Sequence, residues 1–192
     1  MSPLVLPKIL LLGAGGQLGK ELFLYLDEIF NVTSCDYRLL QEGSDLCEPE
    51  QIAATVNRIE PSVIINAAAY TKVDAAESNE SIVHRVNASG VKSLATCAKK
   101  VDALLVHFSS DYVYDGLSKR PYLETDQANP LNVYGKSKLE GDRAIIDSGC
   151  KHLIFRTSWI YSQHGINFLK SILSLAQSKK SIAVVNDQFG VP

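Results

Sequence analysis

The sequence has little cysteine and lacks long apolar runs. Its four cysteines, Cys35, Cys47, Cys97 and Cys150, are widely scattered and form no Cys-x-x-Cys pair. They indicate neither a zinc site nor a disulfide framework, and we expect a reducing, cytoplasmic compartment. No apolar stretch approaches the ~20 residues that span a bilayer, and the first residues lack the basic region and cleavage site of a signal peptide. We therefore expect neither a membrane-spanning nor a secreted protein.

Excess charge of one sign is also missing. The 192 residues include 19 Lys and Arg against 21 Asp and Glu, which gives a formal net charge of -2. A protein that binds nucleic acid through its phosphates normally carries a clear basic excess, so we expect no nucleic-acid partner. The histidines, His84, His107, His152 and His164, show no metal-ligand spacing, and we expect no metal site among them. Length and composition are typical of one globular domain.

Apolar runs alternate with helical patterns along the chain. Short runs typical of buried parallel strands occupy residues 8–12, 32–35, 63–65, 104–108, 153–155 and 182–185. Helical stretches occupy residues 17–26, 50–59, about 78–100, 134–148 and 166–177. This alternation predicts an α/β fold with a doubly wound parallel sheet. A long irregular stretch, residues 112–132, is of the kind that more often serves a function.

The first predicted strand runs directly into a glycine-rich turn. Gly13, Gly16 and Gly19 follow a Gly-x-x-Gly-x-x-Gly spacing, with Gln17 and Leu18 between the last two, and a helix opens there. Glycine permits the tight turn and lets a diphosphate approach the backbone N–H groups at the helix N-terminus. Because a strand precedes the motif and a helix follows it, the motif predicts a dinucleotide-binding site.

The end of the second predicted strand bears on cofactor choice. Asp36 lies about twenty residues beyond the glycines, where a carboxylate can accept hydrogen bonds from the adenosine ribose of NAD. Arg38 could instead pair with the 2′-phosphate of NADP. Either side chain could also be a solvated loop charge, so the sequence leaves the choice between NAD and NADP open.

Tyr134 and Lys138 stand four residues apart in a predicted helix and therefore on one helix face. An ammonium beside a phenol lowers the phenol's pKa, and a phenol tuned in this way can exchange a proton with a reacting oxygen. The spacing alone is weak, because it also occurs on ordinary solvated helices. Further polar and aromatic landmarks follow the third and fourth predicted strands, at residues 66–70 and 108–112.

With these landmarks the chain resembles the extended short-chain dehydrogenase/reductase superfamily and, more narrowly, its dTDP-4-dehydrorhamnose reductase family. The narrower resemblance depends on residues 68–77, 110–116, 130–138, 155–161 and 186–192. It implies a Rossmann-like NAD(P)-binding domain that uses NADPH or NADH to reduce a 4-keto sugar linked to a nucleotide, in dTDP-rhamnose biosynthesis.

The resemblance also implies roles for individual residues. The catalytic residues would be Ser110, where the family usually has threonine, with Tyr134 and Lys138. The cofactor would be held by Gly13, Gly16, Gln17, Leu18, Gly19, Asp36, Arg38, Asp45, Leu46, Ala67, Ala68, Tyr70, Tyr134 and Lys138. The substrate would meet Ser110, Asp111, Tyr112 and Trp159, and Asn87 would support the lysine through water. Each also has a plainer interpretation: Ser110 could cap a strand end, and Trp159 could be ordinary core.

Three alternatives stay open. A related dehydratase would need an Asp-Glu pair after the strand-four hydroxyl, and this chain has Asp111 and Tyr112 there. An epimerase would keep the same Ser-Tyr-Lys set, although residues 112–132 look more like those of a reductase. A reductase-like regulatory subunit would bind dinucleotide and a protein partner while its catalysis is dispensable.

The family continues past the motif at residues 186–192 with about 100 further residues that form a smaller substrate-binding lobe. We therefore expect residues 1–192 to be the cofactor-binding domain, without that lobe, and to bind cofactor but reduce substrate poorly. Because the family includes metal-bridged dimers, a homodimer is one expected assembly, and the oligomeric state stays open.

Overall fold

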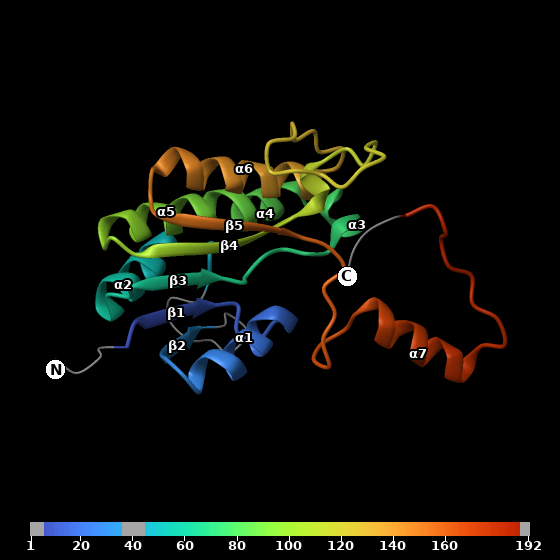
Figure 1. The fold of residues 1–192 in the computed structure, drawn as a ribbon, viewed down its shortest axis with the longest axis horizontal. Coiled ribbons are helices and arrows are strands. Elements are labelled where there is room, and N and C mark those ends of the chain that lie inside the picture. The colour runs from blue at the N-terminus through green and yellow to red at the C-terminus, as the bar shows by residue number, and fades with distance from the viewer. Residues whose placement is uncertain (1–5, 36–44, 189–192) are drawn as a thin grey trace.

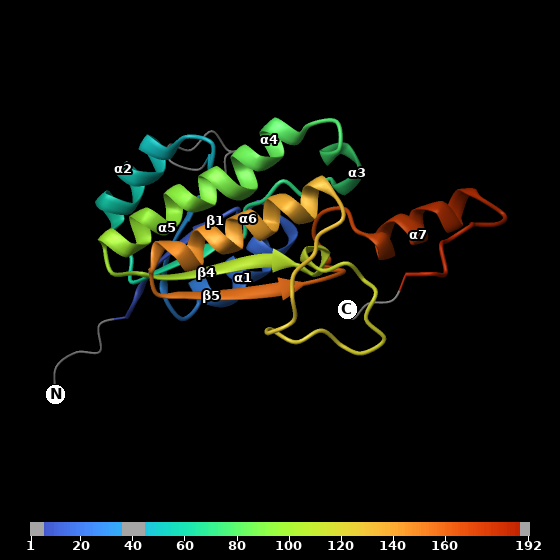
Figure 2. The ribbon, with the colours of Figure 1, turned by 90° about the horizontal axis from the view of Figure 1, so that it is seen from above.

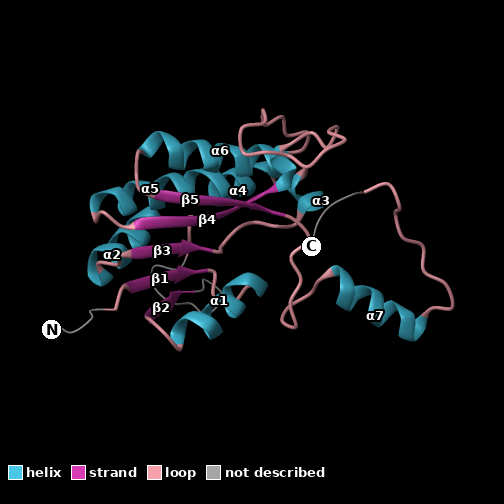
Figure 3. Ribbon diagram, in the orientation of Figure 1, coloured by secondary structure: helices cyan, strands magenta, loops and turns pink. Residues whose placement is uncertain are grey.

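A parallel sheet forms the centre of the molecule (Figures 1 and 3). The computed structural model describes residues 6–35 and 45–188. The strands are β1 (Lys8–Leu12), β2 (Asn31–Cys35), β3 (Val63–Asn66), β4 (Leu104–Ser110) and β5 (His152–Thr157). Their order is β2-β1-β3-β4-β5, and every neighbouring pair is parallel. The predicted doubly wound α/β class is confirmed.

Helices connect the strands. They are α1 (Gln17–Asp27), α2 (Pro49–Ile59), α3 (Val73–Ala76), α4 (Glu80–His84), α5 (Val91–Lys100), α6 (Val133–Ser148) and α7 (Phe168–Ser178).

The strand predicted at residues 182–185 is wrong, because this stretch has no regular structure and its apolar side chains Val184 and Val185 stay exposed. A strand needs a neighbouring edge to pair with, and a run of apolar residues does not provide one.

Alternate side chains of the strands enter two different cores. Leu10 and Leu12 pack with residues of α2, α5 and α6, which overlie one face of the sheet (Figure 2). Ile9 and Leu11 point the other way and pack against α1. This second face is less covered, because Leu153 and Phe155 on β5 remain 50% and 47% exposed.

The helix predicted over residues 78–100 is formed in three parts. A π-helical turn, Arg85–Gly90, joins α4 to α5. α6 passes close to this turn, since a Cβ on Gly141 would lie 2.3 Å from the carbonyl oxygen of Asn87. Insertion of one residue into a helical turn often marks a functional position, and here it directs the Asn87 side chain inward, where it is buried.

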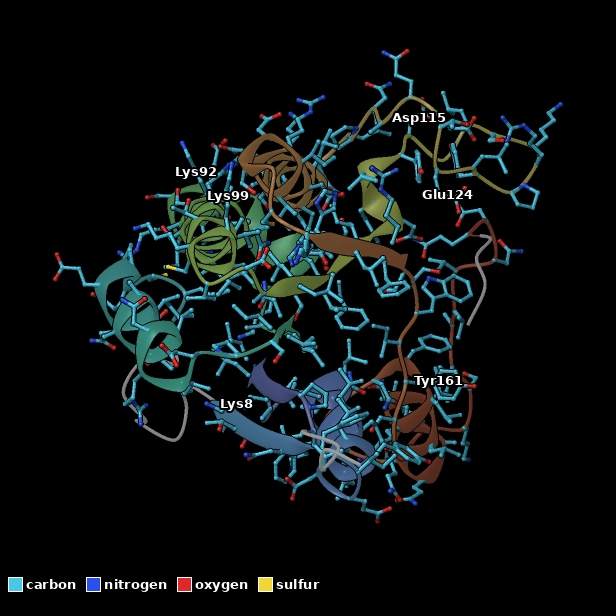
Figure 4. The ribbon with its side chains drawn as sticks, turned by 60° about the vertical axis from the view of Figure 1, so that its left-hand side comes forward. Lys8, Lys92, Lys99, Asp115, Glu124 and Tyr161 are labelled. Carbon is cyan, nitrogen blue, oxygen red and sulfur yellow. The ribbon has the colours of Figure 1, made fainter. Side chains whose placement is uncertain are left out.

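The long loop between β4 and α6 packs largely on itself. It opens with a 3-10 turn, Asp111–Val113, and Tyr114 stacks on Tyr122 at a ring distance of 4.1 Å. Arg120 donates to Asp126 through its two terminal guanidinium nitrogens. Asp115 and Glu124 mark this loop in Figure 4, and Tyr161 lies on the separate segment that leads from β5 to α7. The loop therefore flanks the carboxyl end of β4 as an ordered unit.

Candidate active site

A cavity of about 1120 Å³ opens at the carboxyl ends of β1, β3, β4 and β5. The chain leaves β1 toward α1 on one face of the sheet and leaves β3 toward the helices of the other face. Parallel α/β sheets bind ligands at such a reversal, beyond the carboxyl ends of the strands. The sheet order therefore places this cavity where a ligand site is expected.

The glycine turn forms one wall of the cavity. Gly13 has φ +80°, and a Cβ there would lie 2.6 Å from the backbone nitrogen of Ala68, so only glycine fits. Gly16 precedes the first turn of α1, which has neither a side-chain cap nor an acidic residue. The N–H groups of this turn are thus open to an anion, and the residues present fit a dinucleotide diphosphate.

Gly19 differs from the other two glycines. It is buried and does not line the cavity, and a Cβ there would lie 2.1 Å from the carbonyl oxygen of Gly13. Its contribution is therefore close packing of α1 against the turn. Of the three glycines only Gly13 and Gly16 line the cavity, and their contact with a diphosphate stays a prediction.

Two polar side chains hold the start of α6 and so position Tyr134. Asn132 accepts a hydrogen bond from Gly135 N at 2.7 Å, and Glu77 accepts one from Val133 N at 2.9 Å. These bonds satisfy N–H groups that would otherwise lack partners at the helix start. Tyr134, in the first turn, faces the cavity next to Tyr112, whose ring meets it edge-on at 5.7 Å.

The phenol of Tyr134 is not tuned in the way the sequence suggested. Burial raises its pKa above the usual value, and a hydrogen bond with Ser110 opposes this in part. The expected lowering by Lys138 is absent from the causes of this shift. Lys138 Nζ instead donates to the carbonyl oxygen of Phe108 at 2.7 Å and lies 3.3 Å from His107 Nε2. The prediction of a lowered pKa is therefore wrong for this structure, in which the amine is engaged by β4.

Lys138 is buried, with 1% of its surface exposed, yet it lines the cavity. Burial lowers its pKa to about 8, because a charged ammonium loses hydration there. The negative charge of Asp142 opposes this effect. Lys138 can therefore change its charge near neutral pH, which an exposed lysine does not do.

Ser110 and Asp111 close the end of β4. Ser110 Oγ donates to Asp111 Oδ1 at 3.2 Å and accepts from Tyr112 N at the same distance. Burial raises the pKa of Asp111, while the Ser110 hydroxyl acts in the opposite direction. The capping interpretation of Ser110 and its catalytic interpretation are thus compatible, because the hydroxyl that serves the turn also acts to lower the pKa of Tyr134.

Trp159 lies at the cavity and is 51% exposed, so the interpretation as core is wrong. Its backbone has φ +48°, which is uncommon for a residue with a large side chain. Strained backbone of this kind tends to occur at functional sites. Asn167 and Ser162 further tie this segment to α1 through Gln17 and Glu21.

Most of the predicted site residues converge on the cavity. Those that line it are Gly13, Gly16, Gln17, Leu18, Ala67, Ala68, Tyr70, Ser110, Asp111, Tyr112, Tyr134, Lys138 and Trp159. Asp45 and Leu46 do not: Asp45 accepts from Cys47 N at 2.8 Å, and Leu46 belongs to the core. Asp36 and Arg38 lie outside the described residues.

Sequence reasoning missed a buried polar group beneath Lys138. His107, given no role from the sequence, and Asp142 are both fully buried there. The only available signal was a histidine inside an apolar strand and a carboxylate four residues after Lys138. Asn87, expected to act on the lysine through water, bonds the backbone of Tyr70 at 2.9 and 3.1 Å and Ser137 at 3.0 Å.

Across residues 6–35 and 45–188, no helix has the length and apolar character needed to cross a membrane. Within the same ranges no cluster of three or more His, Cys, Asp or Glu side chains could hold a metal ion.

The fold and the cavity define a Rossmann-like α/β domain with a dinucleotide-type site at its switch point. Residues 7–192 match the family described as RmlD substrate binding domain, and the chain belongs to this family. It is 46% identical over 184 residues to the dTDP-4-dehydrorhamnose reductases of Shigella flexneri and Escherichia coli K12, which covers 96% of this chain. The crystal structure of dTDP-4-dehydrorhamnose reductase from Bacillus anthracis in complex with NADP superposes with a TM-score of 0.90 at 37% identity, over 95% of this chain.

The relatives are longer than this chain. The alignments span 62% of the Shigella flexneri and Escherichia coli proteins and 64% of the Bacillus anthracis structure.

Proposed function

We propose that this chain is the cofactor-binding part of an NADPH- or NADH-dependent dTDP-4-dehydrorhamnose reductase. The observation that carries the proposal is the convergence of Ser110, Tyr134 and Lys138 on one cavity beside the glycine turn. The curated relatives of that name and the NADP-bound structure support the same assignment.

The cofactor would enter along the carboxyl ends of the strands. The N–H groups at the start of α1 would hold the diphosphate beside Gly13 and Gly16, and Ala67 and Ala68 would line the channel. An ammonium has three N–H donors, and one of those on Lys138 already goes to Phe108 O. The others can bind ribose hydroxyls, which would position the nicotinamide.

The bound cofactor would supply a hydride to the C4 carbonyl of the keto sugar, so negative charge would develop on the carbonyl oxygen. Tyr134 would donate its proton to that oxygen, and its raised pKa keeps the phenol protonated and ready to donate at neutral pH. Ser110 would give the same oxygen a hydrogen bond. Tyr112 and Trp159 would face the sugar from the cavity wall.

Other chemistries of the same superfamily fit this site less well. A dehydratase needs a second carboxylate beside Asp111, and Tyr112 occupies that position. An epimerase is compatible with the three catalytic side chains, but the curated relatives at 46% identity are named as reductases. A non-catalytic regulatory subunit would have no need for the buried Tyr134 and Lys138 at the cavity.

The lengths of the relatives support a domain assignment. We propose that residues 1–192 form the cofactor domain and that a substrate lobe corresponds to the part of the relatives beyond the match. The helix α7 supports this, because none of its residues is buried and Phe168, Leu169 and Leu173 are more than half exposed. In Figure 1 this helix stands apart from the sheet. A lobe packed on it would cover these side chains.

The test compares this chain with a version extended by the C-terminal part of a relative. Titration with NADPH and NADH, followed by cofactor fluorescence, should show binding by both proteins and will decide between the two cofactors. Oxidation of the bound cofactor by dTDP-4-keto-6-deoxy-L-mannose should be fast only in the extended protein. Absence of turnover by a cofactor-bound extended protein would refute the reductase, and equal turnover by both lengths would refute the separate lobe.

A further inference from the structure

A group of buried polar side chains lies under Lys138, and the proton transfer described above does not use it. Its buried members are Asn66 on β3, His107 and Ser109 on β4 and Asp142 on α6. Arg156 on β5, whose side chain is 25% exposed, lies at its edge. His107 and Asp142 are 0% exposed and Asn66 is 1% exposed. Placing ionisable groups so deeply is costly unless they are paired, so the arrangement calls for a function.

Asn66 determines which ring nitrogen of His107 carries the proton. Asn66 Oδ1 accepts a hydrogen bond from Ala68 N at 3.2 Å, so the amide nitrogen faces His107 Nδ1, at 3.0 Å. An amide nitrogen only donates, which makes Nδ1 the acceptor and places the proton of a neutral ring on Nε2. Burial lowers the pKa of His107 well below its usual range, and Lys138 adds to this effect, so the ring is neutral.

The Nε2–H group has two neighbours. Lys138 Nζ lies 3.3 Å away and can accept a hydrogen bond only as a neutral amine. Asp142 Oδ1 lies 4.0 Å away and, although buried, has no hydrogen-bond partner in the described part of the chain. The other oxygen, Asp142 Oδ2, accepts from Ser109 at 2.9 Å and lies 3.5 Å from Arg156 Nε. One oxygen of Asp142 is thus held, and the other is left facing His107.

We propose that His107 is a positioning residue that moves its Nε2–H from Lys138 to Asp142 Oδ1 when the lysine takes up a proton, and back when the lysine loses it. With Lys138 neutral, the amine accepts the bond at the observed distance. With Lys138 charged, two donors would face each other, and a shift of about 1 Å brings Nε2 within hydrogen-bond distance of Asp142. His107 itself neither gains nor loses a proton.

The use of this movement in catalysis depends on the proposed reductase function. After Tyr134 gives its proton to the substrate oxygen, the ammonium of Lys138, which lines the same cavity four residues further along α6, is the source that restores the phenol. The proton leaves Nζ for the phenolate, and the neutral amine that remains accepts the bond from His107. The lysine is thereby held in place in both charge states. The neutral amine has two N–H donors, so beside its bond to Phe108 O it keeps one donor for the cofactor.

The surroundings of Lys138 make both charge states accessible near neutral pH. The titratable or charged groups that face it or its immediate partners are Tyr134 and Asp142 on its own helix, His107 on β4, and Arg156 on β5. Burial lowers the pKa of Lys138 to about 8, and Asp142 opposes that shift. Burial raises the pKa of Asp142, whereas Ser109, Lys138 and Arg156 lower it.

The test is nitrogen NMR of the histidine rings in the ¹⁵N-labelled chain, from pH 6 to pH 10, without cofactor or substrate. We expect His107 to keep its proton on Nε2 throughout, and its Nε2–H signal to shift with a midpoint near pH 8, together with the Lys138 side-chain signal. Asp142→Asn should move that midpoint down by about one pH unit, because it removes the negative charge that favours the charged form of Lys138. Asp147→Asn, an equal charge change on an exposed part of α6, should leave it in place.

A proton on Nδ1, or an Nε2–H signal that stays constant while Lys138 titrates, would overturn the proposal, as would equal shifts in the two variants. If Asp142→Asn does not fold, the titration of the unmodified chain still tests the proposal, because it reports both the protonated ring nitrogen and the Nε2–H shift. In the lobe-extended protein, Asp142→Asn should shift the pH profile of kcat to lower pH, whereas a purely structural role would lower kcat equally at every pH. Because the NMR experiment needs no ligand, failure of cofactor binding or turnover would count against the proposed function alone.

Discussion

Tyr134 and Lys138 share a helix face, but their environments move both pKa values away from the usual ranges in opposite directions. Burial raises the pKa of the phenol and lowers that of the amine. The pair is therefore better described as a protonated donor beside a lysine of variable charge than as a phenolate stabilised by an ammonium. This assignment can be tested one residue at a time.

Removing the Tyr134 hydroxyl should separate chemistry from binding. Tyr134→Phe keeps the ring that packs against Tyr112 but removes the proton donor. Turnover of the lobe-extended protein should fall by about 10²–10⁴, as is typical when a general acid is lost. Cofactor affinity of the 192-residue chain should change by less than about threefold, since the ring stays in place. A variant that keeps most of its rate would show that Tyr134 is not the acid.

Replacing Lys138 should change how stability depends on pH. Its pKa is about 8 in the folded chain against a usual 10.5, so between these values the unfolded chain binds a proton that the folded chain does not. Stability contributed by this group therefore rises with pH across that window, by up to about 3 kcal/mol. Lys138→Met should lack this rise.

The measurement is urea unfolding of both proteins at pH 7.5 and pH 10.5. The free energy of unfolding of the unmodified chain, minus that of Lys138→Met, should increase with pH. Lys136→Met, on an exposed part of the same helix, provides the matched control and should show no such change. A pH-independent difference for Lys138→Met would mean that the buried lysine titrates at its ordinary value.

At the scale of elements, the glycine turn contains one glycine that matters for folding and another, three residues away, that matters for binding. Gly19→Ala should lower stability by about 2–3 kcal/mol or more, because its Cβ would lie 2.1 Å from a backbone oxygen in a buried turn. Gly16→Ala meets only Gly13 O at 3.3 Å and has an ordinary φ of -76°, so stability should change by less than about 1 kcal/mol. The methyl group that Gly16→Ala introduces should nevertheless weaken NADPH binding at least about tenfold, because it would occupy the space through which the diphosphate approaches the backbone.

Calorimetric unfolding and fluorescence titration of both variants check this separation. If Gly16→Ala bound cofactor as tightly as the unmodified chain, the diphosphate would not rest on this turn.

The sequence did not distinguish the two glycines, since both satisfy the same spacing. The difference lies in which backbone atoms surround each one after folding.

The elements themselves could largely be predicted, because strand and helix periodicities depend on nearby residues. Five of the six predicted strands form, and the site residues that follow strand ends, such as Ser110 and Tyr70, meet at the cavity. The environment of Lys138 could not be predicted in this way. It depends on His107 and Asn66, which come from strands far apart in sequence and are aligned by the register Asn66↔His107. The strand predicted at residues 182–185 was wrong for the same reason, since strand pairing depends on residues far away in the sequence.

At the scale of the whole molecule, apolar surface remains uncovered on β5 and on α7. Leu153 and Phe155 on β5 are about half exposed, and α7 exposes Phe168, Leu169 and Leu173. Figure 2 shows α7 beyond the end of the sheet, away from the helices that cover it. Exposed apolar patches of this kind mark contact surfaces. The length of the relatives makes the proposed C-terminal lobe the natural occupant.

A charge placed on α7 should therefore matter only when the lobe is present. Leu173 is 57% exposed, so Leu173→Glu should change the stability of the 192-residue chain by less than about 0.5 kcal/mol. In the lobe-extended protein the same carboxylate would be buried without a partner, and the cost should be about 2 kcal/mol or more. Urea unfolding of both lengths gives the comparison, and Ser174→Glu, at the neighbouring exposed position, controls for charge on the helix. If Leu173→Glu were harmless in the extended protein, the lobe would pack elsewhere and the apolar face of α7 would need a different partner.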